Sequence, residues 1–221
     1  MSELDPYSPP EVAVVVEERK VPEGVQVSDP TSLSRWSIGL LVVATLIDLV
    51  DHIWLTTVGR DSLSVGILDG VEAQISGFVY LANVIVFLCW SYRVLKNAQS
   101  VDPGTQTVSP GWGVGSYFVP IVNLWIPAKA LMQASRVSGT SVGLVLAWWL
   151  VAMGIIVLAV AYIFWAFNAP MEDWDTYSNA PTGFDHVITV VDLVSVWLEV
   201  VMILGLTRVH REWAASSPNI S

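Results

Sequence analysis

Charged side chains and cysteines are both scarce in this sequence, and each shortage narrows the class of protein. Asp, Glu, Lys and Arg make up 14% of the 221 residues, and Cys89 is the only cysteine. A single cysteine excludes a disulfide within the chain and a zinc site built from cysteines. Ten basic residues are outnumbered by twenty acidic ones, which gives a net charge of −10. Because proteins that bind nucleic acids neutralise phosphates with Lys and Arg, this balance argues against nucleic acid as a partner.

The short motifs of common enzyme classes are also missing. The sequence has no glycine-rich phosphate-binding loop, no Gly-x-Ser-x-Gly elbow and no His-Glu-x-x-His run, each of which marks a known catalytic arrangement. His52 has carboxylates nearby but too few neighbouring ligands for a metal ion. We therefore predict that the protein is not an enzyme and that it holds neither a metal ion nor a cofactor.

Apolar residues are abundant instead. They make up 53% of the chain, and the mean hydropathy is +0.58. They gather in four long stretches, at about residues 36–59, 76–93, 140–168 and 184–209. A helix needs about 20 apolar residues to cross a bilayer, and only helices or closed barrels satisfy their backbone groups in lipid. The sequence predicts an all-α fold, an integral membrane four-helix bundle.

The ends of the chain differ in composition from this apolar part. Residues 1–30 are acidic and contain prolines but no apolar core of the length that a signal peptide needs, so we expect a disordered N-terminal tail. Its start, residues 5–10, also has the composition of an extended docking peptide. We expect one four-span transmembrane domain over residues 31–213 and a short C-terminal tail over residues 214–221.

The basic residues predict the orientation of the spans in the membrane. All but Arg60 lie before the first stretch, between the second and third, or after the fourth: Arg19, Lys20, Arg35, Arg93, Lys96, Lys129, Arg136, Arg208 and Arg211. Cytoplasmic segments of membrane proteins carry the excess of Lys and Arg. We therefore expect both termini and the connection between the second and third spans in the cytoplasm. Within this set, Arg93, Lys96, Lys129 and Arg136 form a predicted basic rim that faces lipid headgroups, or that simply anchors the spans.

The connection over residues 98–139 is unusually apolar for a linker. It combines a Ser-Pro-Gly-Trp turn with an apolar run interrupted by prolines, and the residues of this hairpin motif are Ser109, Pro110, Gly111, Trp112, Pro120, Asn123 and Pro127. Such a run is too short to cross the bilayer. It predicts a helical hairpin on the cytoplasmic side, either re-entrant or lying flat at the interface. In a re-entrant hairpin we expect Asn123 to be buried, with its amide paired to backbone.

Five polar side chains lie inside predicted spans. Asp48, Asp51 and His52 are three or four residues apart in the first span, a spacing that shares one helix face. Asp192 and Glu199 are seven residues apart in the fourth span and also share a face. Ionisable residues in membrane spans mark proton or cation pathways, although interhelical hydrogen bonds also fix packing. The cluster predicts proton or cation handling, or a polar contact that sets helix register.

Several short motifs together resemble one family of membrane proteins. They are Trp90-Ser91-Tyr92-Arg93 with Asn97, the turn at residues 109–112, the segment from Pro120 to Pro127, and the pair Trp148-Trp149. From about Trp36 to Arg211 the chain resembles a bacterial family of multi-span membrane proteins known as domain of unknown function 4328. The resemblance implies a four-span protein of the bacterial cytoplasmic (inner) membrane and assigns no activity.

Two functions are consistent with these observations. The first is a small membrane binding or scaffold protein, with the lipid bilayer, other membrane proteins or a second copy of the chain as partners. The alternative is a transporter or channel-like module in which the intramembrane carboxylates carry protons or cations.

Overall fold

The computed structural model describes residues 20–58, 63–168 and 183–217. Most of the predicted N-terminal tail, Arg60, the connection between the last two spans and the end of the C-terminal tail therefore lie outside the described residues.

Over the described ranges the chain is helical and contains no strand, which confirms the predicted all-α class. The long helices are α1 (Thr31–Val58), α2 (Leu63–Val101), α5 (Val142–Asn168) and α7 (Gly183–Ser216). Each contains a segment long and apolar enough to cross a membrane: Thr31–Trp54, Gln74–Val101, Val142–Ala161 and His186–Ser216. The architecture is that of a multi-pass membrane protein with four spans.

The connection between α2 and α5 is a bent helical segment. It consists of α3 (Pro110–Gly115), η1 (Ser116–Phe118), η2 (Val122–Leu124) and α4 (Ile126–Ser138). Its two halves meet at an angle of 115°, because Pro120 cannot continue a helix.

Short sequence signals set the ends of this bent segment. Ser109 caps α3 by accepting a hydrogen bond from the Trp112 N–H, and Pro110 occupies the first turn, where a missing N–H costs nothing. Gly139 ends α4 with a φ of 68°, a left-handed conformation that glycine adopts readily.

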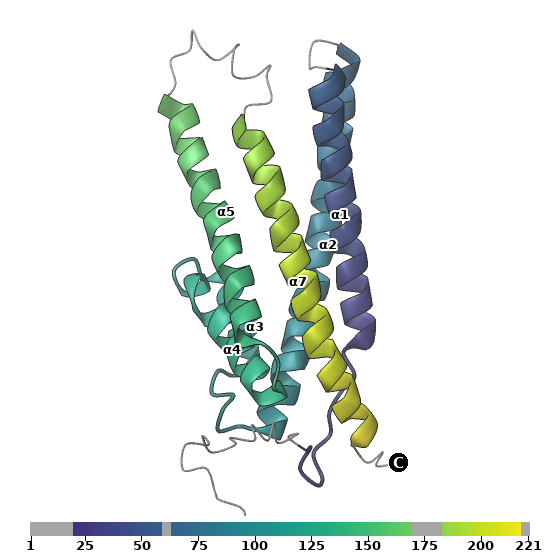
Figure 1. The fold of residues 1–221 in the computed structure, drawn as a ribbon, viewed down its shortest axis with the longest axis vertical. Helices are drawn as coiled ribbons and strands as arrows, with labels where there is room; N and C mark the ends of the chain where they lie inside the picture. Colours follow the sequence, from purple (N-terminus) through teal and green to yellow (C-terminus); the bar gives the residue numbers. More distant parts are fainter. Residues whose placement is uncertain (1–19, 59–62, 169–182, 218–221) are drawn as a thin grey trace, which may run out of the picture.

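Figure 1 shows how the elements are arranged. Helices α1 and α2 form one side of the bundle, α7 lies in the middle, and α5 lies on the other side. The start of the described chain, the connection from α2 to α3 and the C-terminal end of α7 share the lower end of the view. The bent segment begins and ends there, and α4 packs against α2 and α5. We use "lower" and "upper" in the sense of Figure 1.

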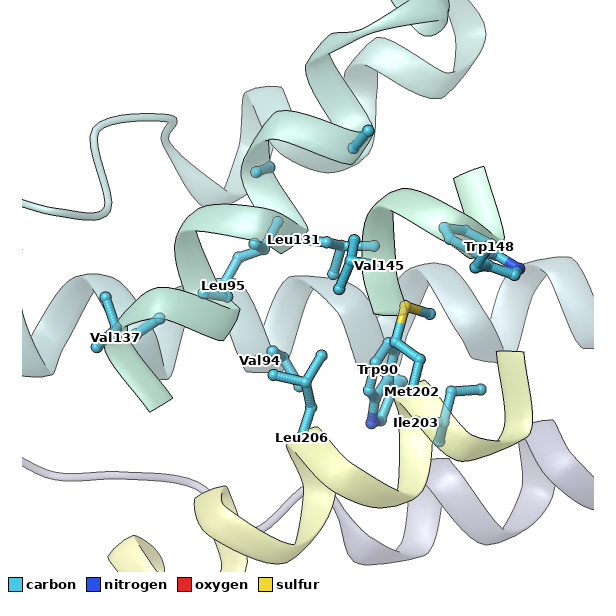
Figure 2. Close-up of a cluster of buried hydrophobic side chains, with 14 of the residues drawn as sticks. Trp90, Val94, Leu95, Leu131, Val137, Val145, Trp148, Met202, Ile203 and Leu206 are labelled. Carbon is cyan, nitrogen blue, oxygen red and sulfur yellow. The ribbon is translucent and has the colours of Figure 1, made fainter. Parts of the chain in front are cut away.

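The core lies in the lower half of the bundle, where α2, α4, α5 and α7 meet (Figure 2). Trp90, Leu131, Met202 and Leu206 are almost completely buried. The Trp90 indole N–H also finds a partner there, because it donates a hydrogen bond of 3.0 Å to Thr207 Oγ1. Large apolar side chains of the upper half remain exposed, as expected of a surface that lipid covers.

Residues 20–30, which we expected to be disordered, pack on this core. Val27 and Pro30 are buried, and the Ser28 N–H donates a hydrogen bond of 3.0 Å to Asn97 Oδ1 of α2. Arg93 donates a further hydrogen bond of 2.9 Å to the carbonyl of Asp29. The acidic composition of the tail therefore did not predict the behaviour of its last eleven residues.

Candidate functional site

A cavity of about 240 Å³ lies among α1, α2 and α7 in the upper half of the bundle. Its lining combines polar and apolar side chains: Thr45, Asp48, Leu49, Tyr80, Ile188, Thr189, Asp192 and Leu193. The structure thus brings together two carboxylates that are far apart in the sequence. Both belong to the candidate membrane spans. We call this space the upper cavity.

Asp48 is held by α2. Its carboxylate accepts hydrogen bonds from the Tyr80 hydroxyl and, at 3.1 Å, from the Ser76 hydroxyl. Ser76 and Tyr80 are four residues apart, so they lie on one face of α2. Asp192 reaches the same cavity from α7, so the two carboxylates line one space.

A pair of histidines lies above these acids, with His52 four residues from Asp48 and His186 six residues from Asp192. His52 Nε2 of α1 is 3.0 Å from His186 Nδ1 of α7, and the two rings meet edge to face with centroids 5.0 Å apart. The Thr189 hydroxyl lies 3.5 Å from His52 Nδ1. Hydroxyl and imidazole groups both donate and accept hydrogen bonds, so the region from this pair to Asp192 contains groups that can form a hydrogen-bonded chain.

Sequence reasoning missed four of these partners, namely Ser76, Tyr80, His186 and Thr189. A signal for two of them was present: His186 and Thr189 lie three residues apart, as do Thr189 and Asp192, so neighbouring members of this series lie close together on α7. No comparable pattern marked Tyr80, because a lone tyrosine in an apolar span is ordinary.

The structure does not bring Asp51 to the upper cavity, although we expected it to share a face with Asp48 and His52. Asp51 instead lines an open groove of about 490 Å³ along α1 and α2, together with Glu72 and Trp54. Residues three apart on a helix are rotated by about 60° from each other. That rotation is enough to place Asp51 on the other side of the contact between α1 and α2.

Glu199 lies lower on α7 and belongs to a separate site. It accepts a hydrogen bond of 3.3 Å from the Trp148 indole N–H of α5. Trp148 packs against Trp149 and Phe87 with ring centroids 5.6 and 5.8 Å apart. Tyr117 of η1 completes this aromatic cluster through a T-shaped contact with Phe87 at 6.2 Å.

The residues of the predicted hairpin motif have different environments. Ser109 and Pro110 start α3, and Pro127 is buried at the start of α4. Gly111, Trp112 and Pro120 are exposed.

Asn123 corrects one expectation. Its Oδ1 atom is buried and has no hydrogen-bond partner within the described chain. Our expectation that the side-chain amide pairs with backbone is therefore wrong for this oxygen. The break in the helix is tied down from α5 instead, because the Trp149 indole N–H donates a hydrogen bond of 3.1 Å to the Leu124 carbonyl.

The residues of the predicted basic rim differ in their exposure. Lys96, Lys129 and Arg136 are exposed, whereas Arg93 is half-buried and holds the N-terminal segment through Asp29.

A polar junction fixes the lower end. Asn97 Nδ2 donates hydrogen bonds to the Ser28 carbonyl at 2.7 Å and to His210 Nδ1 at 3.3 Å. An amide nitrogen only donates, so His210 Nδ1 accepts and Nε2 carries the proton. His210 Nε2 lies 3.0 Å from Ser138 Oγ, and the Ser138 hydroxyl donates to the Ala134 carbonyl at 2.7 Å. This chain of hydrogen bonds joins the N-terminal segment, α2, α7 and α4.

Among the described residues, no three His, Cys, Asp or Glu side chains lie close enough together to hold a metal ion. The upper cavity therefore offers carboxylates and hydroxyls, with the histidine pair above it, rather than a compact ligand set.

These features define a four-span membrane protein with an acidic intramembrane cavity and a bent helical segment at its lower end. The chain belongs to the family described as Domain of unknown function (DUF4328), whose model matches residues 63–210. We expected the similarity to begin near Trp36, but the match leaves out α1 and with it Asp48 and His52. No curated protein and no solved structure matches the chain.

Proposed function

We propose that this chain takes up protons and passes them through the interface of α1, α2 and α7. One observation carries the proposal: Asp48 and Asp192, from helices far apart in the sequence, line a single cavity within candidate membrane spans. An ionisable group at the centre of a span costs about 2.5 to 3.5 kcal/mol on insertion scales. Proton relays in membrane proteins use such buried acids, histidines and hydroxyls.

The chemistry of the lining favours protons over a bound metal ion or a large solute. The cavity is small, at about 240 Å³, and no compact set of three metal-binding side chains occurs in the described ranges. Tyr80 and Ser76 donate hydrogen bonds to Asp48, while the contact between His52 and His186 lies above. A proton entering from the upper end would thus meet imidazole nitrogens first and a carboxylate next.

We propose the cytoplasmic membrane of a bacterium as the location, with both termini and the bent segment on the cytoplasmic side. The excess of Lys and Arg on that side supports this orientation. The bent segment is in this proposal a re-entrant hairpin: it starts and ends at the lower end (Figure 1) and exposes Phe118 and Ile121 at its tip, by 72% and 70%. We also propose that the protein is not an enzyme.

Proton flux into liposomes that contain the purified protein tests the proposed function. A potassium diffusion potential would drive protons inward, and a pH-sensitive dye inside the liposomes would report them. We expect Asp48→Asn and Asp192→Asn to lower the flux by about tenfold or more, because proton transfer by a positioned group contributes about 10² to 10⁴ in rate.

Asp51→Asn is the matched control for this experiment. It makes the same change on the same helix, but Asp51 lines the groove on α1 and α2 and not the upper cavity. We expect its flux to equal that of the wild type. Equal losses in all three variants, or no flux in the wild type, would refute proton transfer through the cavity.

Self-association is a second candidate function, of the scaffold type. The groove of about 490 Å³ along α1 and α2 favours it, because its lining of Val43, Leu46, Ile47 and Val50 is suited to a helix from a second copy. In a Cys89→Ala background, Val43→Cys should form a disulfide-linked dimer in membranes. Leu150→Cys on α5, equally apolar and 61% exposed, should not. Equal cross-linking at both positions would contradict a specific interface.

A further inference from the structure

The lower half of the bundle contains a second acidic site that the upper cavity does not include. Glu199 lies seven residues after Asp192 on α7, so the two carboxylates point from the same helix face at heights about 10 Å apart. Trp148 of α5 holds Glu199 in place through its indole N–H. Glu199 thus follows Asp192 in the direction of the lower end.

The Tyr117 hydroxyl is the unusual feature of this site. It is buried and has no hydrogen-bond partner within the described chain. Its ring is fixed by T-shaped contacts with Phe87 at 6.2 Å and Trp149 at 6.3 Å. The Trp149 N–H is already used by the Leu124 carbonyl. Glu199 borders the same aromatic cluster, because it accepts a hydrogen bond from Trp148, which packs against Trp149.

A second unpaired atom lies on the same tip of the bent segment. Asn123 Oδ1 of η2 is also buried and also lacks a partner among the residues that the structure describes, and η2 packs against η1, which carries Tyr117. Buried polar groups without a protein partner are usually satisfied by ordered water, which needs two to four polar partners. A phenol O–H, an amide oxygen and a carboxylate together offer one donor and several acceptors.

We propose that Tyr117, Asn123 and Glu199 hold ordered water and form an inner proton-binding station between Asp192 and the lower end. This inference rests on the proposed proton-handling function. A proton would leave the carboxyl group of Asp192, cross by water and bind a carboxylate oxygen of Glu199. It would then leave Glu199 through the water at Tyr117. Only O–H bonds break and form, so both acids return to their starting state after each transfer.

The experiment compares proton flux in liposomes for wild type, Asp192→Asn, Glu199→Gln and Tyr117→Phe. We expect Glu199→Gln to lower the flux about as much as Asp192→Asn, by about tenfold or more, and Tyr117→Phe to lower it by a smaller factor. Tyr92→Phe is the matched control, because Tyr92 lies on the exposed side of α2 and should keep wild-type flux.

Infrared spectroscopy of the same samples measures the position of the Glu199 carboxyl band, which a purely structural role of Tyr117 would leave unchanged. Tyr117→Phe should shift the carboxyl band that disappears in Glu199→Gln, because the water between the two groups is lost. If Glu199→Gln fails to fold, the proton flux of Tyr117→Phe still tests the proposal. This variant removes only one oxygen, which has no partner in the described chain.

The outcomes separate this inference from the proposed function. If Asp192→Asn stops the flux while Glu199→Gln and Tyr117→Phe keep it, the inner station is overturned and proton transfer at the upper cavity stands. If the wild type carries no flux, both are overturned. Loss in Asp192→Asn and Glu199→Gln together with a shifted carboxyl band in Tyr117→Phe would support the station.

Discussion

The junction at Asn97 gives the sharpest test of how the lower end is held together. We consider Asn97→Leu, which keeps a side chain of similar size but removes all its hydrogen bonds. The change removes the hydrogen bonds of Asn97 with the Ser28 N–H, the Ser28 carbonyl and His210 Nδ1. Ser28 is exposed and can bond to water instead, whereas His210 has 0% of its surface exposed. The main penalty therefore falls on the buried imidazole.

The size of this penalty follows from the separate contributions. An unsatisfied buried acceptor costs about 1 to 3 kcal/mol, and each of the two hydrogen bonds to Ser28 contributes about 0.5 to 1.5 kcal/mol. We expect Asn97→Leu to lower the free energy of unfolding by about 2 to 6 kcal/mol. Adding His210→Leu should recover at least 1 kcal/mol of that loss, because both polar partners are then gone and Ser138 keeps its hydrogen bond to Ala134.

Unfolding in mixed micelles of a mild detergent and SDS, followed by tryptophan fluorescence, measures these changes. Gln99→Leu is the control, since Gln99 is a half-buried amide on the same helix with no part in the junction. Trypsin should also cut faster after the exposed Lys20 in Asn97→Leu, because the segment before α1 loses its attachment. An unchanged midpoint in Asn97→Leu, or a double variant as unstable as the sum of the single ones, would refute the reasoning.

Two further predictions concern packing and topology. A methyl group at Gly113 would lie 2.5 Å from Leu95 Cδ1 and 3.2 Å from Ala130 Cβ, whereas one at Gly111 would meet nothing within 4 Å. In the same unfolding assay, Gly113→Ala should therefore lower the free energy of unfolding by about 1 to 3 kcal/mol. Gly111→Ala should leave it unchanged. Reporter fusions should indicate the cytoplasmic side at Ser2, within residues 102–107 and at Ser221, and the outer side near Thr176. An outer-side signal at Ser221 would contradict the four-span topology.

The spans were predictable because lipid imposes a simple rule on composition. The apolar stretches at residues 36–59 and 140–168 match α1 and α5 closely. Helix α2 is much longer than its predicted stretch and begins at Leu63, where acidic residues interrupt the apolar pattern. Hydropathy detects the part of a helix that lies in lipid, and a helix continues beyond it wherever its backbone hydrogen bonds allow.

The polar partners were harder to predict because they depend on how spans rotate against each other. The intramembrane position of Asp48 and Asp192 was visible in the sequence, and their meeting required only that the first and fourth spans be neighbours. The pairing of Asp48 with Tyr80 and of Glu199 with Trp148 depends on helix rotation, which packing sets and composition does not. The same rotation moved Asp51 away from the cavity.

The two halves of the bundle differ in a way that bears on how protons reach the upper cavity. Completely buried side chains such as Trp90, Leu131 and His210 lie in the lower half, where separating the helices would expose the core. Above the upper cavity, α1 and α7 are joined by the contact of His52 with His186 and a long one with Thr189. Helices separate most easily where they share the fewest buried contacts. We therefore expect protons to enter the cavity from the upper end. Protons must then leave downward through a packed region, where groups already in place, such as Glu199 and Tyr117, are needed to carry them.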